Sequence, residues 1–118
     1  MALILIVDDE PGVRRFLRKC LVGAGHNVLE AADGIEAVDR LHLSPVDLVL
    51  LDLVMPHREG LETLGIIREQ YANIKVIAMS GRFPEFLRPA ELLGAVGSLA
   101  KPIRPEELLA LVRQALAE

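Results

Sequence analysis

Short apolar runs alternate along the whole chain with longer segments of helical periodicity. The runs have the length of β-strands and end near Gly, Pro, Asp or Ser: Leu3–Val7, Asn27–Glu30, Asp47–Leu51, Lys75–Met79 and Val96–Leu99. Strands that alternate with helices predict a parallel sheet covered by helices on both faces. Right-handed crossovers leave few topologies, and we expect a doubly wound α/β sheet with strand order 2-1-3-4-5.

Helical periodicity marks four of the segments between the runs. After Pro11, which suits a first helical turn, apolar side chains share one face, and Gly23 and Gly25 predict the end of the helix. This face comprises Val13, Phe16, Leu17, Cys20 and Leu21. The other three helices are expected around Gly34–Leu41, around Leu61–Tyr71 and after Pro105. Cys20, the only cysteine, is interpreted as a small core residue and not as a nucleophile.

The stretch from residue 82 to residue 93 fits a regular helix less well. It contains Pro84 and Pro89, and each proline removes a backbone hydrogen-bond donor. We therefore predict a short helix that starts only at Pro89.

Composition restricts the class of protein. The chain has 118 residues, of which 52% are apolar, so we expect a single domain over residues 1–118 with a sizeable core. A net charge of −4 argues against non-specific binding to nucleic acid or to an anionic membrane surface. No apolar run approaches the roughly 20 residues needed to span a bilayer, and the run from Ala2 to Val7 is too short for a signal-peptide core. The expected location is the cytoplasm.

Polar residues follow the predicted strands at their carboxyl ends. Asp8 and Asp9 follow the first run and Asp52 the third, whereas Ser80 follows the fourth and Lys101 lies just past the fifth. In strand order 2-1-3-4-5, the first and third strands are neighbours where the winding direction reverses, which is where such sheets bind ligands. The topology therefore brings three carboxylates, a hydroxyl and an ammonium group to one crevice.

Each of these residues also has an ordinary structural interpretation. Asp8 or Asp9 would cap the following helix, with Glu10 near the positive end of its dipole. The acid after the third strand and the serine after the fourth would be turn residues, and the lysine a solvated side chain. All of these interpretations would have to coincide at one end of one sheet, so we favour a functional site and leave only Glu10 with its structural role.

Three carboxylates within a few ångströms do not all stay ionised cheaply unless a cation is present. A small all-oxygen cluster suits Mg²⁺, which takes one or two carboxylates together with waters and phosphate oxygens. The chain has no D-x-D-x-D-G loop for calcium and no His and Cys spacing for zinc. The sequence therefore predicts a magnesium site.

Four stretches, read in order, resemble the receiver domain of bacterial two-component response regulators: IVDDEPGVRRFL, LVLLDLVMPHREGLE, VIAMSG and GAVGSLAKPI. The resemblance covers all five predicted strands and implies a flavodoxin-like fold. It further implies that Asp9 and Asp52, with the backbone carbonyl of Val54, hold Mg²⁺, and that Asp8 acts mainly through a metal-bound water.

The resemblance also implies how the phosphoryl group is handled. Asp52 would be the phosphoacceptor, attacking the phosphohistidine of a sensor histidine kinase or a phosphotransfer protein. Lys101 would pair with phosphoryl oxygens, Ser80 would donate a hydrogen bond to one of them, and the Lys101–Pro102 peptide would be cis. The protein would be a phosphorylation-dependent switch and not an enzyme, although it would assist its own Mg²⁺-dependent phosphorylation and dephosphorylation.

Two departures from the family pattern concern the output. Ser98 occupies the position, three residues before the lysine, where the family often has an aromatic residue that reports phosphorylation. The segment 82–93 is unlike a regular fourth helix, although the face formed by residues 80–101 would contact an output domain or protein partner. A homodimer is a separate possible assembly. An interaction module with the same fold that is not controlled by phosphorylation is the alternative function.

Two further classes fit less well. A metal-dependent phosphohydrolase would have a second carboxylate two residues after Asp52, where Val54 stands. A flavin-binding protein would need backbone donors and hydroxyls in the acidic first loop.

Overall fold

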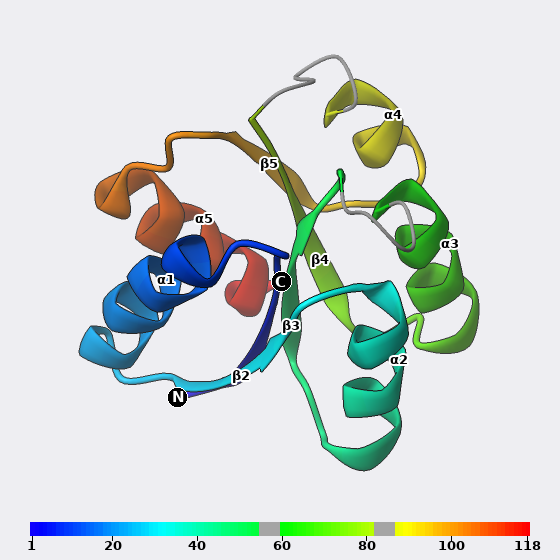
Figure 1. Ribbon diagram of the computed structural model, residues 1–118, viewed down its shortest axis with the longest axis horizontal. Helices are drawn as coiled ribbons and strands as arrows, with labels where there is room; N and C mark the ends of the chain where they lie inside the picture. The colour runs from blue at the N-terminus through cyan, green and yellow to red at the C-terminus, as the bar shows by residue number, and fades with distance from the viewer. Residues whose placement is uncertain (55–59, 82–86) are drawn as a thin grey trace.

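The computed structural model describes residues 1–54, 60–81 and 87–118. Its five parallel strands have the order β2-β1-β3-β4-β5, so the predicted topology is confirmed (Figure 1). The strands are β1 (Leu3–Val7), β2 (Asn27–Ala31), β3 (Leu48–Asp52), β4 (Lys75–Ser80) and β5 (Gly97–Ala100). Strands β3 and β4 extend one residue further than the apolar runs, so Asp52 and Ser80 are the last strand residues and do not follow the strands.

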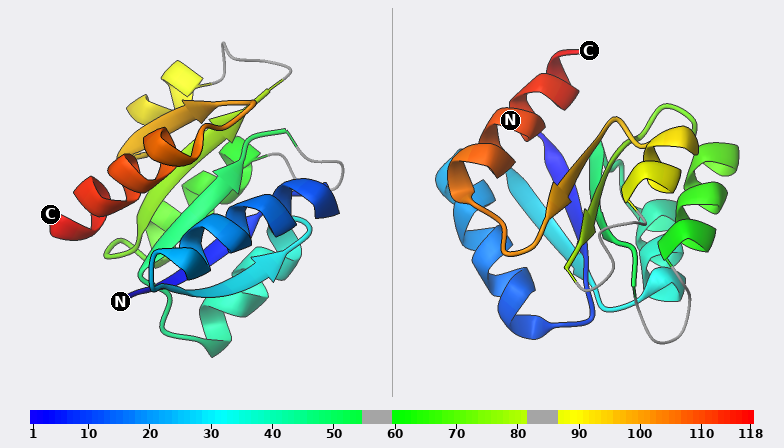
Figure 2. Two further views of the ribbon diagram at one scale, coloured as in Figure 1. Left: turned by 90° about the vertical axis from the view of Figure 1, so that its left-hand side faces the viewer. Right: turned by 90° about the horizontal axis from the view of Figure 1, so that it is seen from above.

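Helices cover both faces of the sheet, as the alternating pattern predicts. Within the described residues they are α1 (Pro11–Gly23), α2 (Gly34–Leu43), α3 (Gly60–Gln70), α4 (Leu87–Leu92) and α5 (Pro105–Ala117). Helices α1 and α5 lie on one face, and α2, α3 and α4 lie on the other (Figures 1 and 2). No described helix has both the length and the apolar character needed to cross a bilayer.

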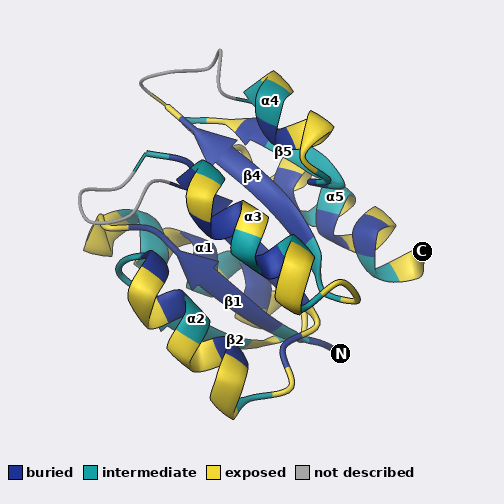
Figure 3. Ribbon diagram, turned by 90° about the vertical axis from the view of Figure 1, so that its right-hand side faces the viewer, coloured by how far each residue is buried: buried dark blue, intermediate teal, exposed yellow. Residues whose placement is uncertain are grey.

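The apolar core is divided into two layers by the sheet. Along β1, Leu5 and Val7 face the layer under α2, α3 and α4, whereas Ile4 and Ile6 face the layer under α1 and α5. All five residues of β3 are buried, as expected for the central strand of a sheet that is covered on both faces. Its neighbours β1 and β4 are buried along nearly their whole length (Figure 3). Asp52 is the last of the buried residues of β3 and therefore lies at the carboxyl end of the central strand.

Helix α1 follows the predicted boundaries. Pro11 occupies the first helical turn, and Gly25, with a φ of 95°, supplies the left-handed backbone that follows the helix. Leu17 and Leu21 are fully buried, and Cys20 is half-buried against the same core layer. Phe16, which the periodicity places on the apolar face, is 40% exposed and lies at the edge of that face.

Helix α4 differs from its prediction at its start. It begins at Leu87 and not at Pro89, because a proline in the first turn costs no helical hydrogen bond: the first amides of a helix have no intrahelical acceptor. The helix is short, as predicted, with only six residues. It ends where the amide of Ala95 donates to Ala90 O (3.0 Å) and Gly94 adopts a φ of 109°. Pro84 lies outside the described residues.

Candidate functional site

The five predicted site residues meet at the carboxyl edge of the sheet. Asp8 and Asp9 directly follow β1, Asp52 ends β3, Ser80 ends β4, and Lys101 directly follows β5. The register pairs Ser80 with Ala100, and the backbone amide of Lys101 donates to Ser80 O (2.9 Å). Strand pairing therefore positions the lysine next to the end of the central strands.

The ammonium group of Lys101 bridges two buried carboxylates. Its Nζ lies 2.7 Å from Asp8 Oδ2 and 3.5 Å from Asp52 Oδ2, and a third contact of 3.6 Å reaches Glu10 Oε1. Burial by itself would lower the pKa of Lys101, but the hydrogen bond and negative charge of Asp8, with the charges of Asp52 and Glu10, raise it. The side chain is only 16% exposed, so Lys101 is not a solvated surface lysine but a fixed positive charge inside the site.

Asp52 is a desolvated carboxylate. The residue is 4% exposed, and burial raises its pKa from 3.8 to about 6, with the negative charge of Asp8 adding to the shift. Lys101 and the amide of Val54, which donates to Asp52 Oδ1 (3.2 Å), act in the opposite direction without cancelling it. A group that is costly to ionise gains from any cation placed beside it.

The two acids after β1 have different environments. Asp8 is fully buried, and both of its oxygens accept: Oδ1 from the amide of Glu10 (2.9 Å) and Oδ2 from Lys101. Asp9 is exposed, and its side chain makes no hydrogen bond or ion pair within the described part of the chain. Asp8 is thus committed to the protein, whereas Asp9 presents an open carboxylate.

The chain matches the family described as "Response regulator receiver domain" over residues 4–113. It belongs to the response regulator receiver domain family. Among its curated relatives is response regulator MprA of Mycobacterium sp. (strain KMS), 39% identical over 114 residues, or 96% of this chain and 50% of the relative. Transcriptional regulatory protein CpxR of Escherichia coli (strain K12) is also 39% identical, over 98% of this chain and 50% of the relative. The chain therefore spans about half the length of these curated relatives.

Solved structures agree with this assignment. The receiver domain of NtrX from Brucella abortus superposes with a TM-score of 0.92 at 28% identity, covering 97% of this chain and 98% of that one. Chemotaxis protein CheY4 of Vibrio cholerae gives a TM-score of 0.89 at 32% identity, with 98% and 99% covered. The flavodoxin-like fold predicted from the sequence is therefore confirmed by its neighbours as well as by its topology.

The acidic groups of this receiver domain suit a divalent cation. Carboxylate oxygens from Asp8, Asp9 and Glu10 lie within 4.8 Å of one another, and Asp52 lies close enough to Asp8 and Asp9 for both to raise its pKa. Such a set, composed of oxygen donors and short of compensating charge, matches the preference of Mg²⁺. The residues present therefore fit the metal that the family resemblance implies.

Glu10 belongs to the site, although the sequence predicted only a structural role for it, near the positive end of the helix dipole. It is the N-cap of α1, but its side chain makes no capping hydrogen bond; its carboxylate joins the acidic group and contacts Lys101. The ordinary interpretation of Asp8 holds in part, because its side chain does accept from a backbone amide two residues ahead. The position of Glu10 directly after Asp8 and Asp9 was the sequence feature that could have predicted its place in the acidic group.

Two further expectations concern single positions. The Lys101–Pro102 peptide is cis, as the resemblance implies. Ser80 is fully buried at the end of β4 and is not an exposed turn serine.

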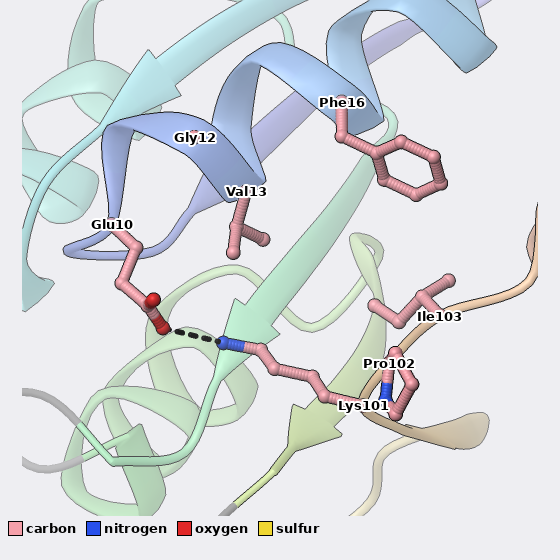
Figure 4. Close-up of a pocket in the computed structure, with 7 residues that line it drawn as sticks. All are labelled: Glu10, Gly12, Val13, Phe16, Lys101, Pro102 and Ile103. Carbon is pink, nitrogen blue, oxygen red and sulfur yellow. Dashed lines mark ion pairs between the residues drawn. The ribbon is translucent and has the colours of Figure 1, made fainter.

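A mainly apolar hollow of about 520 Å³ opens beside the lysine (Figure 4). Val13 and Phe16 of α1 form one wall, and Pro102 and Ile103, which precede α5, form the other. The Glu10–Lys101 ion pair lies at one end of the hollow. This surface gives access to the charged groups from the side of α1.

Proposed function

We propose that this receiver domain is a phosphorylation-dependent switch of a two-component phosphorelay, in which Asp52 accepts a phosphoryl group. Phosphohistidine on a sensor histidine kinase or a phosphotransfer protein is the donor. Asp9, Asp52 and the backbone carbonyl of Val54 would hold Mg²⁺, and Asp8 would support the site from beside them. Lys101 and Ser80 bind the phosphoryl oxygens.

The transfer step needs a nucleophile in line with the bond that breaks. A carboxylate oxygen of Asp52 forms the new O–P bond while the N–P bond of the phosphohistidine breaks. The electron pair of that bond returns to the imidazole nitrogen of the donor. The product is an acyl phosphate on Asp52 and a neutral histidine on the partner.

Charge compensation during this step comes from both the protein and the metal. The Lys101 ammonium, already beside Asp52 Oδ2, pairs with the developing negative charge on the equatorial phosphoryl oxygens. When bound, Mg²⁺ supplies further positive charge to the carboxylates and the phosphoryl oxygens. The raised pKa of Asp52 supports a role for both cations, because Lys101 alone does not offset the cost of burying the negative charge of this carboxylate.

Ser80 converts the modification into a change of structure. It ends β4 one residue beyond Met79, the register partner of Asp52, and its hydroxyl is the donor that we assign to an oxygen of the phosphorylated Asp52. A new hydrogen bond there favours one of two arrangements of the following loop, which is how a local charge biases a two-state element. The face formed by residues 80–101 then carries the output, and on it Leu92 and Leu93 are 75% and 50% exposed.

The observation that carries the proposal is the Lys101 bridge. This largely buried lysine contacts the carboxylate of Asp8, which follows β1, and that of Asp52, which ends β3, where the winding of the sheet reverses. The apolar hollow beside it supports approach of the donor protein from the α1 side, where Val13 and Phe16 are accessible.

The direct test is phosphorylation by acetyl phosphate with Mg²⁺, read by intact mass. We expect a gain of one phosphoryl group that Asp52→Asn abolishes and that chelation of Mg²⁺ prevents. Asp39→Asn, which removes an exposed carboxylate of α2, is the matched control and keeps the gain. If no donor phosphorylates the parent chain, the alternative of an interaction module without phosphorylation control replaces the proposal.

A further inference from the structure

We propose that Arg14 is a positioning residue for the acidic loop: it fixes the backbone between Asp8 and Asp9 and so directs the open carboxylate of Asp9 toward the cation. This inference rests on the proposed function for its biological meaning, since it concerns the same metal site. Its structural basis is independent of phosphorylation, and it can fail while the proposed function holds.

The backbone of Asp8 is held on both sides. Its amide donates to Ala31 O (3.1 Å), which extends the pairing of β1 with β2 by one residue beyond Val7. Its carbonyl accepts from Arg14 Nη1 at 2.6 Å. The peptide that joins Asp8 to Asp9 contains this carbonyl, so the arginine sets the plane of that peptide.

Arg14 is itself held in place by the edge strand. Its Nε donates to Glu30 Oε1 at 2.9 Å, and the other oxygen of Glu30 accepts from Arg18 Nε at 2.6 Å. The side chain of Arg14 is 18% exposed and that of Glu30 28%, so these charge-assisted hydrogen bonds are partly sheltered from water. The arginines beside Glu30 lower its pKa, Arg18 contributing more than Arg14, so the carboxylate stays ionised as the anchor.

Asp9 depends on this backbone more than Asp8 does. The carboxylate of Asp8 is fixed by Glu10 and Lys101 whatever the orientation of its carbonyl. The carboxylate of Asp9 makes no hydrogen bond or ion pair with any residue that the structure describes. Its direction is therefore inherited from the main chain. That main chain is held before Asp9 by Arg14, at the Asp8 carbonyl, and after it by the amide of Glu10, which donates to Asp8 Oδ1.

An arginine is required for this connection. The planar guanidinium donates from Nε and Nη1 in fixed directions and so joins a carboxylate on β2 to a carbonyl after β1 at the same time. A lysine at position 14 would keep the positive charge but would place it at a single atom, without the two fixed donor directions. The Lys variant therefore separates geometry from charge.

Charge alone predicts the opposite result from positioning. Removing the cation of Arg14 reduces repulsion toward a bound divalent ion, so a purely electrostatic role makes Mg²⁺ bind more tightly in Arg14→Met. Loss of positioning makes Mg²⁺ bind more weakly in the same variant. The sign of the change in affinity decides between the two roles.

The test is calorimetric titration of MgCl₂ into the phosphate-free protein, with no phosphodonor present. We expect Arg14→Met and Arg14→Lys each to weaken Mg²⁺ binding about tenfold, the size usual for a residue that orients a metal ligand. Arg18→Met is the matched control, because it removes an ion pair to the same Glu30 from the same helix without touching Asp8. Its Mg²⁺ affinity should stay within about twofold of the parent, since it leaves the oriented ligand in place.

A second measurement does not involve the metal. In Mg²⁺-free buffer the backbone amide resonances of Asp9 and Glu10 should shift in both Arg14 variants and stay close to the parent in Arg18→Met. Unchanged resonances, or Arg14 variants that bind Mg²⁺ as well as or better than the parent, would overturn the inference. A parent chain that is phosphorylated on Asp52 while the Arg14 variants behave as parent would reject the positioning role alone. A parent that is not phosphorylated would instead reject the proposed function.

Discussion

The two flanks of Asp52 are held by different kinds of interaction. On the acidic flank, formed by the loop 8–10 with β2 and α1, the loop is tied by a backbone hydrogen bond to Ala31 and by Arg14 to the carbonyl of Asp8. Helix α1 adds thirteen residues and two fully buried leucines. On the output flank, formed by α4 and β5, the helix has six residues and buries Ala90. There the side-chain link is a hydrogen bond from Ser98 Oγ to the exposed Glu91 (2.8 Å).

Under the proposed function, this difference separates the groups that carry out the chemistry from the segment that responds to it. Groups that must compensate charge gain from fixed positions, because preorganised groups need no rearrangement during the reaction. A segment that reports a modification must instead have two arrangements of similar free energy, and such segments come from the less stable parts of a fold. Lys101 connects the two flanks: it directly follows β5, and its ammonium contacts Asp8.

The largest expected contrast concerns apolar burial in the two helices. Leu17→Ala in α1 removes a fully buried side chain and should lower the free energy of unfolding by about 2–5 kcal/mol. Leu92→Ala in α4 removes a side chain that is 75% exposed and should change it by less than about 0.5 kcal/mol. Urea unfolding followed by circular dichroism measures both. Similar losses for the two variants would contradict the difference between the flanks.

Ionisation of Asp52, between the two flanks, should oppose folding, and the charge of Asp8 on the acidic flank adds to this effect. The folded-state pKa of Asp52, about 6, lies above its ordinary value of 3.8, so its ionised form is disfavoured by the fold. The stabilisation that protonation gives is complete below about pH 4 and is lost as the pH rises through 6. In Mg²⁺-free buffer at pH 8, Asp52→Asn should therefore raise the free energy of unfolding by about 2–3 kcal/mol, at roughly 1.4 kcal/mol per pKa unit.

The pH dependence provides the control for this prediction. The advantage of Asp52→Asn should fall towards zero below pH 4, and Asp39→Asn on the exposed side of α2 should change stability by less than about 0.5 kcal/mol at either pH. If Asp52→Asn raises the free energy of unfolding equally at both pH values, the gain comes from packing and not from the removal of charge.

Topology and site could be predicted from the sequence because both follow from periodicity. Short apolar runs predicted the strands, right-handed crossovers left few strand orders, and the expected order brings Asp8, Asp52 and Lys101 to one edge without any knowledge of side-chain conformations. The start of α4 at Leu87 was missed because proline was treated as the beginning of the helix, although a first turn tolerates it at several positions.

Side-chain connections were beyond the reach of the sequence. The link from Glu30 through Arg14 to the Asp8 carbonyl depends on which face of β2 meets α1 and on the reach of a particular rotamer. Neither quantity is encoded in a periodic pattern of apolar positions. The same holds for Ser98, whose partner Glu91 lies on a helix whose start was misplaced.

Two glycines of α3 differ in how closely they approach the backbone of Asp52. A Cβ on Gly60 would lie 2.4 Å from the carbonyl oxygen of Asp52 and 2.2 Å from Leu53 Cα, so Gly60→Ala forces a backbone shift at Asp52. A Cβ on Gly65 of the same helix meets nothing within 4 Å. We expect Gly60→Ala to cost about 1–3 kcal/mol and Gly65→Ala to gain about 0.5–1 kcal/mol. Opposite signs in thermal unfolding are the decisive result, and equal signs would contradict the close contact.

The smallest effect concerns the hydrogen bond that joins α4 to β5. Because it is exposed, its loss in Ser98→Ala should lower the free energy of unfolding by only about 0.5 kcal/mol. Its local effect should be larger: the amides of Leu93 and Ala95, which donate to α4 carbonyls, should exchange with solvent several-fold faster. The amide of Ala24 at the end of α1 should be unaffected. Glu91→Gln keeps an oxygen acceptor for Ser98 and should exchange like the parent, whereas Glu91→Ala should match Ser98→Ala. Faster exchange in α1 as well would show that the two flanks are not independently held.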